Sequence, residues 1–205
     1  MAGEVDSGHH ACVTLSTLAA LDLASDQFRD HLAVVSPEQW TAPTPCPDWD
    51  VHYLVAHVVG GNRFAAMVLD GMSSDAAMEA VMSTPQLGDE PFLAFGGSAV
   101  EQRRLFGDAV ERHQLVSHPL GDLDAERFLA MRVFDIALHT WDLAVAIGRR
   151  GDLGTPLAEH VLNIVQREAP GMGFGIEPCG DVSPDATLME RLLDLSGRCV
   201  ELVDA

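Results

Sequence analysis

Apolar side chains recur along this chain at three- and four-residue steps, the spacing that turns one face of a helix towards a core. This periodicity predicts four long helices, at residues 14–35, 51–69, 91–113 and 123–148. Residues 70–89 are predicted to form a loop, with a short helix at about 75–81 left open, and two further helices are expected after residue 148. No stretch alternates apolar and polar residues strongly enough to predict a β-strand.

The ends of the long helices carry recognisable signals. Asp50 is a suitable N-cap for the second helix, as is Asp122 or Asp124 for the fourth. Gly148 should end the fourth helix, because glycine readily adopts the left-handed conformation that follows a last helical turn. Residues 41–49 contain three prolines, which predict a rigid loop before the second helix.

The two shorter helices near the C-terminus are predicted from their first turns. One should begin at Thr155 and end before Pro170. The other follows Thr187 and Glu190, which have the spacing of a capping box, and should end at Ser196.

These elements fit within a single domain of 205 residues, a length that can bury a sizeable core. We predict an all-α fold. Residues 14–148 would form a four-helix bundle, and residues 149–205 would add a two-helix C-terminal extension.

The composition restricts the kinds of partner. The formal net charge is −19 and all twelve basic residues are arginine, so binding to a nucleic-acid backbone is not expected. No apolar run is long enough to span a bilayer, and the N-terminus lacks a signal-peptide pattern. The four cysteines form no C-x-x-C pair, which predicts free thiols in the cytoplasm: Cys12, Cys46, Cys179 and Cys199. A small molecule or a protein is the expected partner, and a homodimer remains open.

The fourth helix carries charged side chains on the face that should look into the core. A 4-3-4-3-4 spacing places one stripe of residues on that face: Phe128, Arg132, Asp135, His139, Asp142 and Ala146. Burying a carboxylate and an imidazole there costs free energy unless a partner pairs them. A divalent metal ion is the most specific candidate for that partner, with Asp135 and His139 as ligands one turn apart.

A third ligand can come from a facing helix, because packed helices lie about 8–10 Å apart. His57 is the best candidate, since it lies on the inward edge of the second helix near Gly60 and Gly61. Two imidazoles and one carboxylate leave coordination positions open, which is typical of a catalytic zinc site. Nickel, iron and manganese also accept this set of ligands.

The sequence leaves the roles of neighbouring residues open. Asp142 follows His139 by about one turn and can orient the imidazole or act as an alternative ligand. Arg132 can orient the Asp135 carboxylate or bind an anionic substrate. Without a metal, the histidines and aspartates can equally be hydrogen-bonded core residues. The Cys46 thiol is expected to be inert, because no cation flanks it in the sequence.

Two stretches resemble the signature motifs of the mycothiol-dependent maleylpyruvate isomerase N-terminal domain family: TPCPDWDVHYLVAHVVGGN at 44–62 and FDIALHTWDLAVAIG at 134–148. That family belongs to the DinB-like metal-binding four-helix bundles. The stretch ERLLDLSGR at 190–198 is similar to the tail of an actinobacterial, stand-alone subgroup. The resemblance covers about residues 14–148 and implies the same fold here.

The resemblance also implies a set of metal ligands. The metal-binding histidine of the family falls on His57, and its Glu-x-x-x-His pair falls on Asp135 and His139. The aspartate here is one methylene shorter than the glutamate of the family. The family order, acid first and histidine four residues later, selects Asp135 over Asp142 as the ligand. Arg132 and Asp142 are then candidates for binding the thiol cofactor.

By resemblance, the expected protein is a divalent-metal-binding enzyme, with zinc as the expected metal and mycothiol as co-substrate. A metal-bound thiolate would attack an electrophilic substrate in a transferase or isomerase reaction. Residues 149–205 are too few for the second domain of the isomerase, which leaves both reactions open. The alternative is a non-catalytic bundle that binds a small ligand or partner, with a structural or lost metal site. For the thiol, we expect the loop at 41–49 and the glycines at 60–61 to wall an open cleft.

Overall fold

The computed structural model describes residues 15–168, 177–180 and 182–198. Within these ranges the helices are α1 (Thr17–Leu32), α2 (Val51–Leu69), α3 (Ser74–Met82), α4 (Pro91–Glu111), α5 (Ala125–Ala146), α6 (Thr155–Glu168) and α7 (Leu188–Leu195). A 3-10 helix, η1 (Pro37–Thr41), precedes α2, and two short strands, β1 (Leu115–Val116) and β2 (Leu123–Asp124), precede α5.

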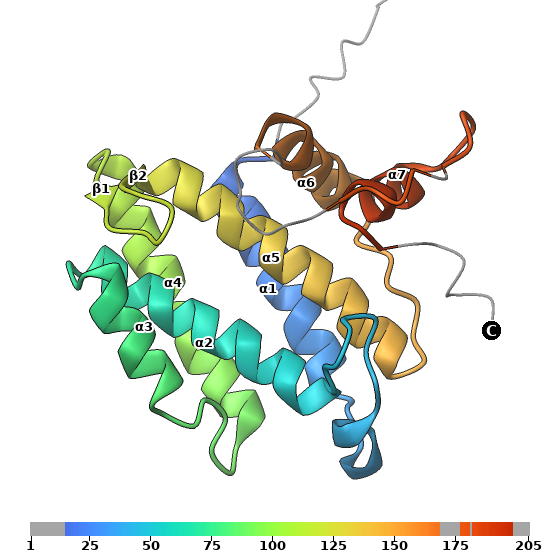
Figure 1. The fold of residues 1–205 in the computed structure, drawn as a ribbon, viewed down its shortest axis with the longest axis horizontal. Coiled ribbons are helices and arrows are strands. Elements are labelled where there is room, and N and C mark those ends of the chain that lie inside the picture. The colour runs from blue at the N-terminus through green and yellow to red at the C-terminus, as the bar shows by residue number, and fades with distance from the viewer. Residues whose placement is uncertain (1–14, 169–176, 181, 199–205) are drawn as a thin grey trace, which may run out of the picture.

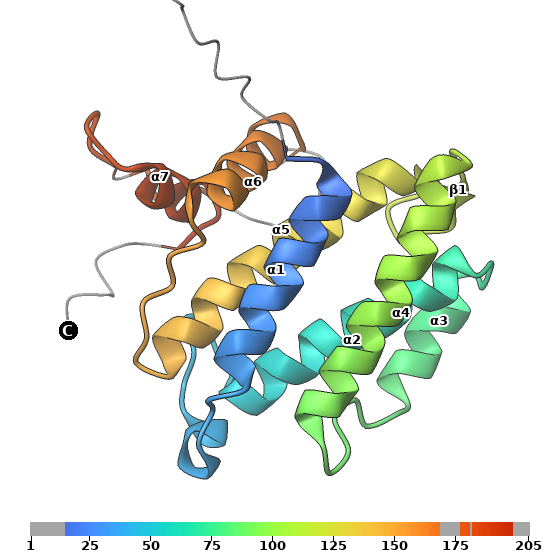
Figure 2. The ribbon, with the colours of Figure 1, turned by 180° about the vertical axis from the view of Figure 1, so that it is seen from behind.

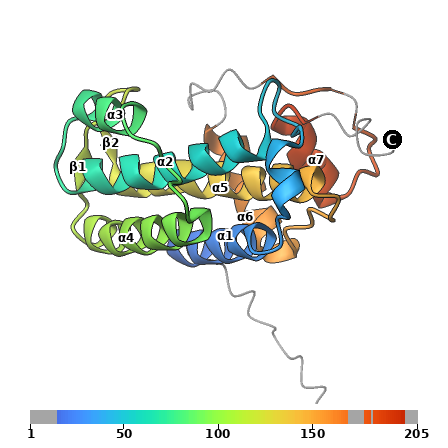
Figure 3. The same cartoon turned by 90° about the horizontal axis from the view of Figure 1, so that it is seen from below.

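Four of the helices form the predicted bundle in two layers. Helices α2 and α5 make up one layer, and α1 and α4 make up the other (Figure 3). Helix α3 packs on α2, and the two strands lie at the end of the bundle where α4 leads into α5 (Figure 1). Helices α6 and α7 pack on each other, and α6 also contacts α1 and α5 (Figure 2). This pair is the predicted C-terminal extension.

The predicted capping residues occupy the ends of the helices. The Asp50 carboxylate accepts a hydrogen bond from the Tyr53 backbone N–H, and Asp124 does the same for Arg127. Helix α5 stops before Gly148, which has a φ of 73°. Helix α1 begins later than predicted, at Thr17, because the Ser16 hydroxyl caps it. The capping box that starts α7 is also present.

One prediction about the secondary structure is wrong. The chain does contain strands, since β1 and β2 pair in antiparallel register, with Leu115 opposite Asp124. Each strand has only two residues, so neither is long enough to show an alternation of apolar and polar positions. The expected end of α6 at Pro170 lies outside the described residues.

Helix α5 is surrounded by the other helices. It packs against α1, α2, α4 and α6, and every residue from Met131 to Ala144 is buried except Asp135. The apolar pattern of this helix therefore runs nearly all the way round. Asp135 is the one residue in that span that is only partly buried.

The prediction of four free thiols is wrong for Cys179, and Cys12 and Cys199 lie outside the described residues. Cys46 is a free thiol, as expected, but Cys179 takes part in a disulfide bond. Among the described residues, no helix combines the length and the apolar character needed to cross a membrane.

Candidate metal centre

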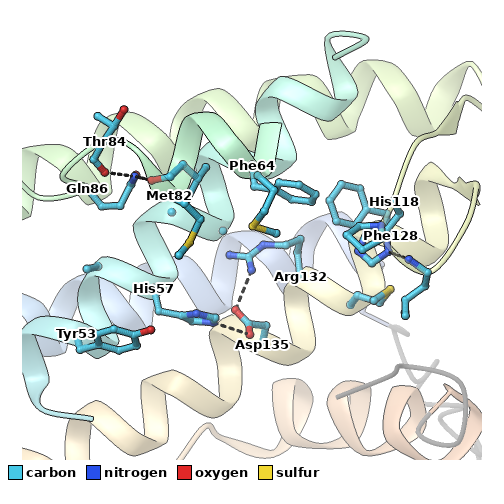
Figure 4. A pocket seen from close by; sticks show the side chains of 18 residues that line it. Tyr53, His57, Phe64, Met82, Thr84, Gln86, His118, Phe128, Arg132 and Asp135 are labelled. Atoms are coloured by element: carbon cyan, nitrogen blue, oxygen red, sulfur yellow. Dashed lines mark hydrogen bonds and ion pairs between the residues drawn. The ribbon is translucent and has the colours of Figure 1, made fainter. Parts of the chain in front are cut away.

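The structure brings the three predicted metal ligands together between α2 and α5. Nε2 of His57 lies 3.2 Å from Oδ1 of Asp135, and Nε2 of His139 lies 3.5 Å from the same oxygen. The ligand atoms of all three side chains lie within 4.8 Å of one another. Figure 4 shows His57, on α2, pointing towards Asp135, on α5.

These distances fit a divalent metal ion. Ligands bound tetrahedrally at about 2.0–2.1 Å from zinc are about 3.3 Å apart, close to the two distances around Oδ1 of Asp135. Two nitrogens and one oxygen form a donor set that zinc and its neighbours in the transition series accept. The shorter aspartate therefore reaches the position that the sequence motif requires of a ligand.

Arg132 holds the Asp135 carboxylate in place. Its Nη1 donates to Oδ2 of Asp135 over 2.8 Å, and its Nη2 donates to Oδ1 of Asn62 over 2.9 Å. This leaves Oδ1 of Asp135 facing the two histidines. Burial by itself would raise the pKa of Asp135, but His57, Arg132 and His139 outweigh it and hold the pKa well below its usual range.

Gly61 makes room for that arginine. A Cβ atom at this position would lie 2.5 Å from Nη1 of Arg132, so a larger residue would displace the guanidinium. Gly60 faces Val81 and Gln86, where a Cβ atom would be 3.2 Å from the valine side chain. We expected both glycines to leave space for a thiol, and they do line a pocket. Their close neighbours show that they also admit side chains from α5 and from the α3 region.

Asp142 orients the second histidine of the site. Nδ1 of His139 donates to Oδ2 of Asp142 over 2.9 Å, which leaves Nε2 for the metal side. The Asp142 carboxylate is fully buried and also accepts two hydrogen bonds from Arg198, at 2.9 Å and 2.6 Å. Burial would raise the pKa of Asp142, but the hydrogen bonds from His139 and Arg198 outweigh burial and lower it to about 2.

The charge on His139 follows from the same contacts. Burial would lower its pKa, but Asp135, Asp142 and the Cys46 thiol together raise the pKa well above its usual value. These contacts favour the protonated form of the imidazole in the metal-free protein. A metal ion must displace this proton to bind, so metal affinity should rise with pH.

Asp142 should make the folded chain sensitive to acid. Its folded pKa, about 2, is lower than the 3.8 of an ordinary aspartate, so its contribution is complete above about pH 4 and is lost as the pH falls towards 2. The shift corresponds to about 2 kcal/mol. Urea unfolding of the metal-free protein at about pH 6 and about pH 2.5 should show a smaller acid loss for Asp142→Asn than for the unchanged chain. Equal losses would contradict this role of Asp142.

A second group of possible ligands shares His139. The Cys46 thiol donates to Oδ2 of Asp142 over 3.3 Å, and its sulfur lies 3.9 Å from Nδ1 of His139. These three side chains also come within 4.8 Å of one another. Arg198 already occupies the Asp142 carboxylate, so a cation there would have to replace an arginine. We therefore take the His57, Asp135 and His139 group as the candidate metal site.

Arg198 was not among the predicted site residues, and the contact of Cys46 with Asp142 was not predicted. Cys46 and Asp142 are 96 positions apart, and Arg198 and Asp142 are 56 apart, so local spacing carried no information about these contacts. One signal was available for Arg198, because it ends the ERLLDLSGR stretch that resembles the tail of the subgroup.

Trp49 covers one side of the centre. Its ring stacks on His139 at 5.5 Å between centroids and packs at 4.8 Å against His57. The loop at 41–49 therefore touches the centre through this side chain. The loop does not line the neighbouring pocket, so the prediction that it walls that cleft is wrong.

A pocket of about 550 Å³ opens beside the centre (Figure 4). His57, Arg132 and Asp135 line it, whereas His139 does not. Two of the three candidate ligands therefore border this pocket. Arg132 and Asp142 are engaged with neighbouring side chains, and their direct contact with a thiol stays a prediction.

The fold and these residues define a class of protein, the DinB-like helical bundle with a short helical extension. Residues 21–144 match the model of the mycothiol maleylpyruvate isomerase N-terminal domain. The chain belongs to this family, as the two sequence motifs indicated.

Two relatives of known sequence come from Mycobacterium tuberculosis. They are the uncharacterized proteins Rv0738, from strain ATCC 25618 / H37Rv, and MT0763, from strain CDC 1551 / Oshkosh. Each is 31% identical over 198 residues, which cover 91% of this chain and 100% of the relative.

The fold is similar to crystal structures of the mycothiol-dependent maleylpyruvate isomerase. The TM-score is 0.58 for a point mutant of that enzyme and 0.55 for the enzyme itself, at 16% identity. Each match covers 74% of this chain and 67% of the isomerase chain. At this identity the likeness supports the fold alone.

Proposed function

We propose that this chain binds one divalent metal ion, preferentially zinc, through His57, Asp135 and His139 and acts as a mycothiol-dependent transferase or isomerase. The observation that carries the proposal is the grouping of three ligand atoms within 4.8 Å of one another, two of them on residues that line a pocket, His57 and Asp135. Membership of the family, whose model is named for mycothiol, supports the choice of thiol. Such a thiol and an electrophilic small molecule would be the two substrates.

The surrounding side chains prepare the site for this chemistry. Arg132 fixes the orientation of Asp135, and Asp142 directs Nε2 of His139 towards the ligand cluster. The Trp49 ring packs against both histidines and restricts their orientation. A divalent metal ion bound there would supply the positive charge that keeps a thiol ionised at neutral pH.

One observation favours the alternative, a bundle that binds a ligand without catalysis. The candidate ligands already form hydrogen bonds and ion pairs with one another and with Arg132. This cluster would remain satisfied if the metal had been lost in evolution. Metal content therefore separates the two functions.

Purified protein should contain about one zinc ion per chain, and His57→Ala should lose most of it. The reason is that two remaining ligands hold zinc far more weakly than three. Elemental analysis by mass spectrometry measures the content. His52→Ala is a matched control, because His52 lies on the exposed face of the same helix and should keep the metal.

Mycothiol should then raise the melting temperature of the zinc-loaded protein. At a concentration a hundred times Kd, a ligand stabilises the folded state by about 2.7 kcal/mol, which is a rise of roughly 5–10 °C for a chain of this size. The His57→Ala variant should show little shift. If zinc is bound and millimolar mycothiol causes no shift, the thiol-dependent function is wrong.

A further inference from the structure

The pocket beside the proposed metal centre has an apolar lining. Small residues of α2 form its floor, among them Ala56, Gly60 and Gly61. Larger apolar side chains from α2, α3, α5 and the turn between the strands surround it: Tyr53, Phe64, Met78, Val81, Met82, Pro119, Leu120, Phe128 and Met131. Its volume of about 550 Å³ lies within the range of roughly 300–1,000 Å³ that is usual for small-molecule sites.

We propose that this pocket binds the apolar body of a substrate that has a single anionic head group, of the class of medium-chain monocarboxylates. The anionic head group would lie at the end of the pocket formed by His57, Asp135 and Arg132. The alkyl chain of the ligand would extend between α2 and α3. The inference rests on the proposed function for the position of the head group. The apolar lining supports the position of the ligand's alkyl chain independently of the proposed function.

The rim of the pocket supports an apolar ligand. Several of its side chains are apolar and yet exposed to solvent: Tyr53 at 54%, Met78 at 42%, Met82 at 77% and Leu120 at 46%. Apolar groups gathered around an opening, rather than scattered over the surface, mark a binding groove. Three of the lining residues are methionines, whose flexible side chains adapt to chains of different shape.

Two polar side chains of the lining away from the centre, Gln86 and His118, form hydrogen bonds within the protein. The Gln86 amide nitrogen donates to the backbone carbonyls of Val81 and Thr84, and its oxygen accepts from Arg63. Nδ1 of His118 accepts from the Leu120 backbone N–H. Burial lowers the pKa of His118, so the imidazole is neutral.

This arrangement distinguishes a monocarboxylate from a dicarboxylate. Among the described residues that line the pocket, Arg132 is the sole arginine, and it lies at the metal end beside Asp135. A zinc ion held by one carboxylate and two neutral imidazoles would add positive charge at that end. A second carboxylate at the far end would find no arginine to pair with among the residues that line the pocket.

Calorimetric titration of the zinc-loaded protein with octanoate, suberate and butyrate tests the proposal. Suberate has the same eight carbons as octanoate but carries a carboxylate at each end, so it should bind at least about tenfold more weakly. Butyrate has four fewer methylenes and should bind on the order of a hundredfold more weakly than octanoate. Equal binding of octanoate and suberate would overturn the proposal, as would the absence of octanoate binding at millimolar concentration.

A variant that gains affinity for suberate would show where the alkyl chain of the ligand lies in the pocket. Met78→Lys places a cation on α3 and should raise suberate affinity at least about tenfold relative to octanoate. Met72→Lys is the matched control, because Met72 is exposed to a similar extent, 40%, but does not line the pocket. An equal rise in suberate affinity in Met78→Lys and Met72→Lys would overturn the assignment of the alkyl chain to this pocket.

The experiment tests the metal centre and the ligand pocket as two separate hypotheses. If the protein binds octanoate but contains no zinc and takes none up, the proposed function is wrong while the apolar site stands. If zinc binds and octanoate does not, the pocket assignment is wrong while the metal centre stands.

Discussion

Asp135→Asn should lose more than a hundredfold in zinc affinity, whereas Asp142→Asn should lose about ten- to a hundredfold and still bind the ion. Oδ1 of Asp135 lies between the two histidine nitrogens of the proposed centre, at 3.2 Å and 3.5 Å. Of the two His139 nitrogens, Asp142 contacts Nδ1, whereas Nε2 is the nitrogen that faces Asp135. Residues that orient a ligand typically contribute ten- to a hundredfold to metal affinity, and a direct ligand contributes more.

The two asparagine variants are closely matched, since each removes one charge and keeps the shape of the side chain. Competition with a chromogenic zinc chelator measures both affinities, and circular dichroism shows that each variant folds. If Asp142→Asn loses the metal and Asp135→Asn keeps it, the ion belongs to the Cys46, His139 and Asp142 group instead. That result would also show that the Glu-x-x-x-His ligand pair of the family does not correspond to Asp135 and His139 in this chain.

Much of the fold could be predicted because its signals are local. The bounds of α2 follow from Asp50 as a cap and from one apolar face, and α7 follows from its capping box. The strands β1 and β2 could not be predicted, because two residues carry no periodicity. The disulfide bond of Cys179 was not predicted, because wide cysteine spacing does not reveal which thiols meet in the fold.

The grouping of the candidate ligands could be predicted for a similar reason. Asp135 and His139 share a helix face, and Gly61 lies on the side of α2 that approaches α5. The close contact that requires a glycine at position 61 could not be predicted, because the contacting residue, Arg132, is far away in the sequence. Contacts between distant segments, such as those of Cys46 and Arg198 with Asp142, depend on the packing of the whole chain.

Arg198→Ala should destabilise the folded chain by about 3–5 kcal/mol, the cost expected when a buried ion pair loses one partner. The Asp142 carboxylate is fully buried, and Arg198 is its one arginine partner among the described residues. His139 and Cys46 still donate to Asp142, so the loss should lie towards the lower end of that range. Urea unfolding at neutral pH measures it.

Arg191→Ala is the matched control for this variant. Arg191 lies on α7, is exposed, and donates to the backbone carbonyl of Pro184, so its removal should change stability by less than about 0.5 kcal/mol. Arg198→Lys should recover part of the loss, because a lysine keeps the charge without the paired hydrogen bonds. Equal stability of the two alanine variants would show that the extension does not support α5 through this ion pair.

The pH dependence separates the ion pair from simple packing. Arg198 lowers the pKa of Asp142, so its removal should raise that pKa, and the variant should lose less stability than the unchanged chain on acidification. The difference between the two proteins should therefore be largest above about pH 4 and shrink as the pH falls towards 2. A packing defect would persist across that range. Shrinkage in acid would establish that the C-terminal extension acts on α5, and through Asp142 on His139, by charge.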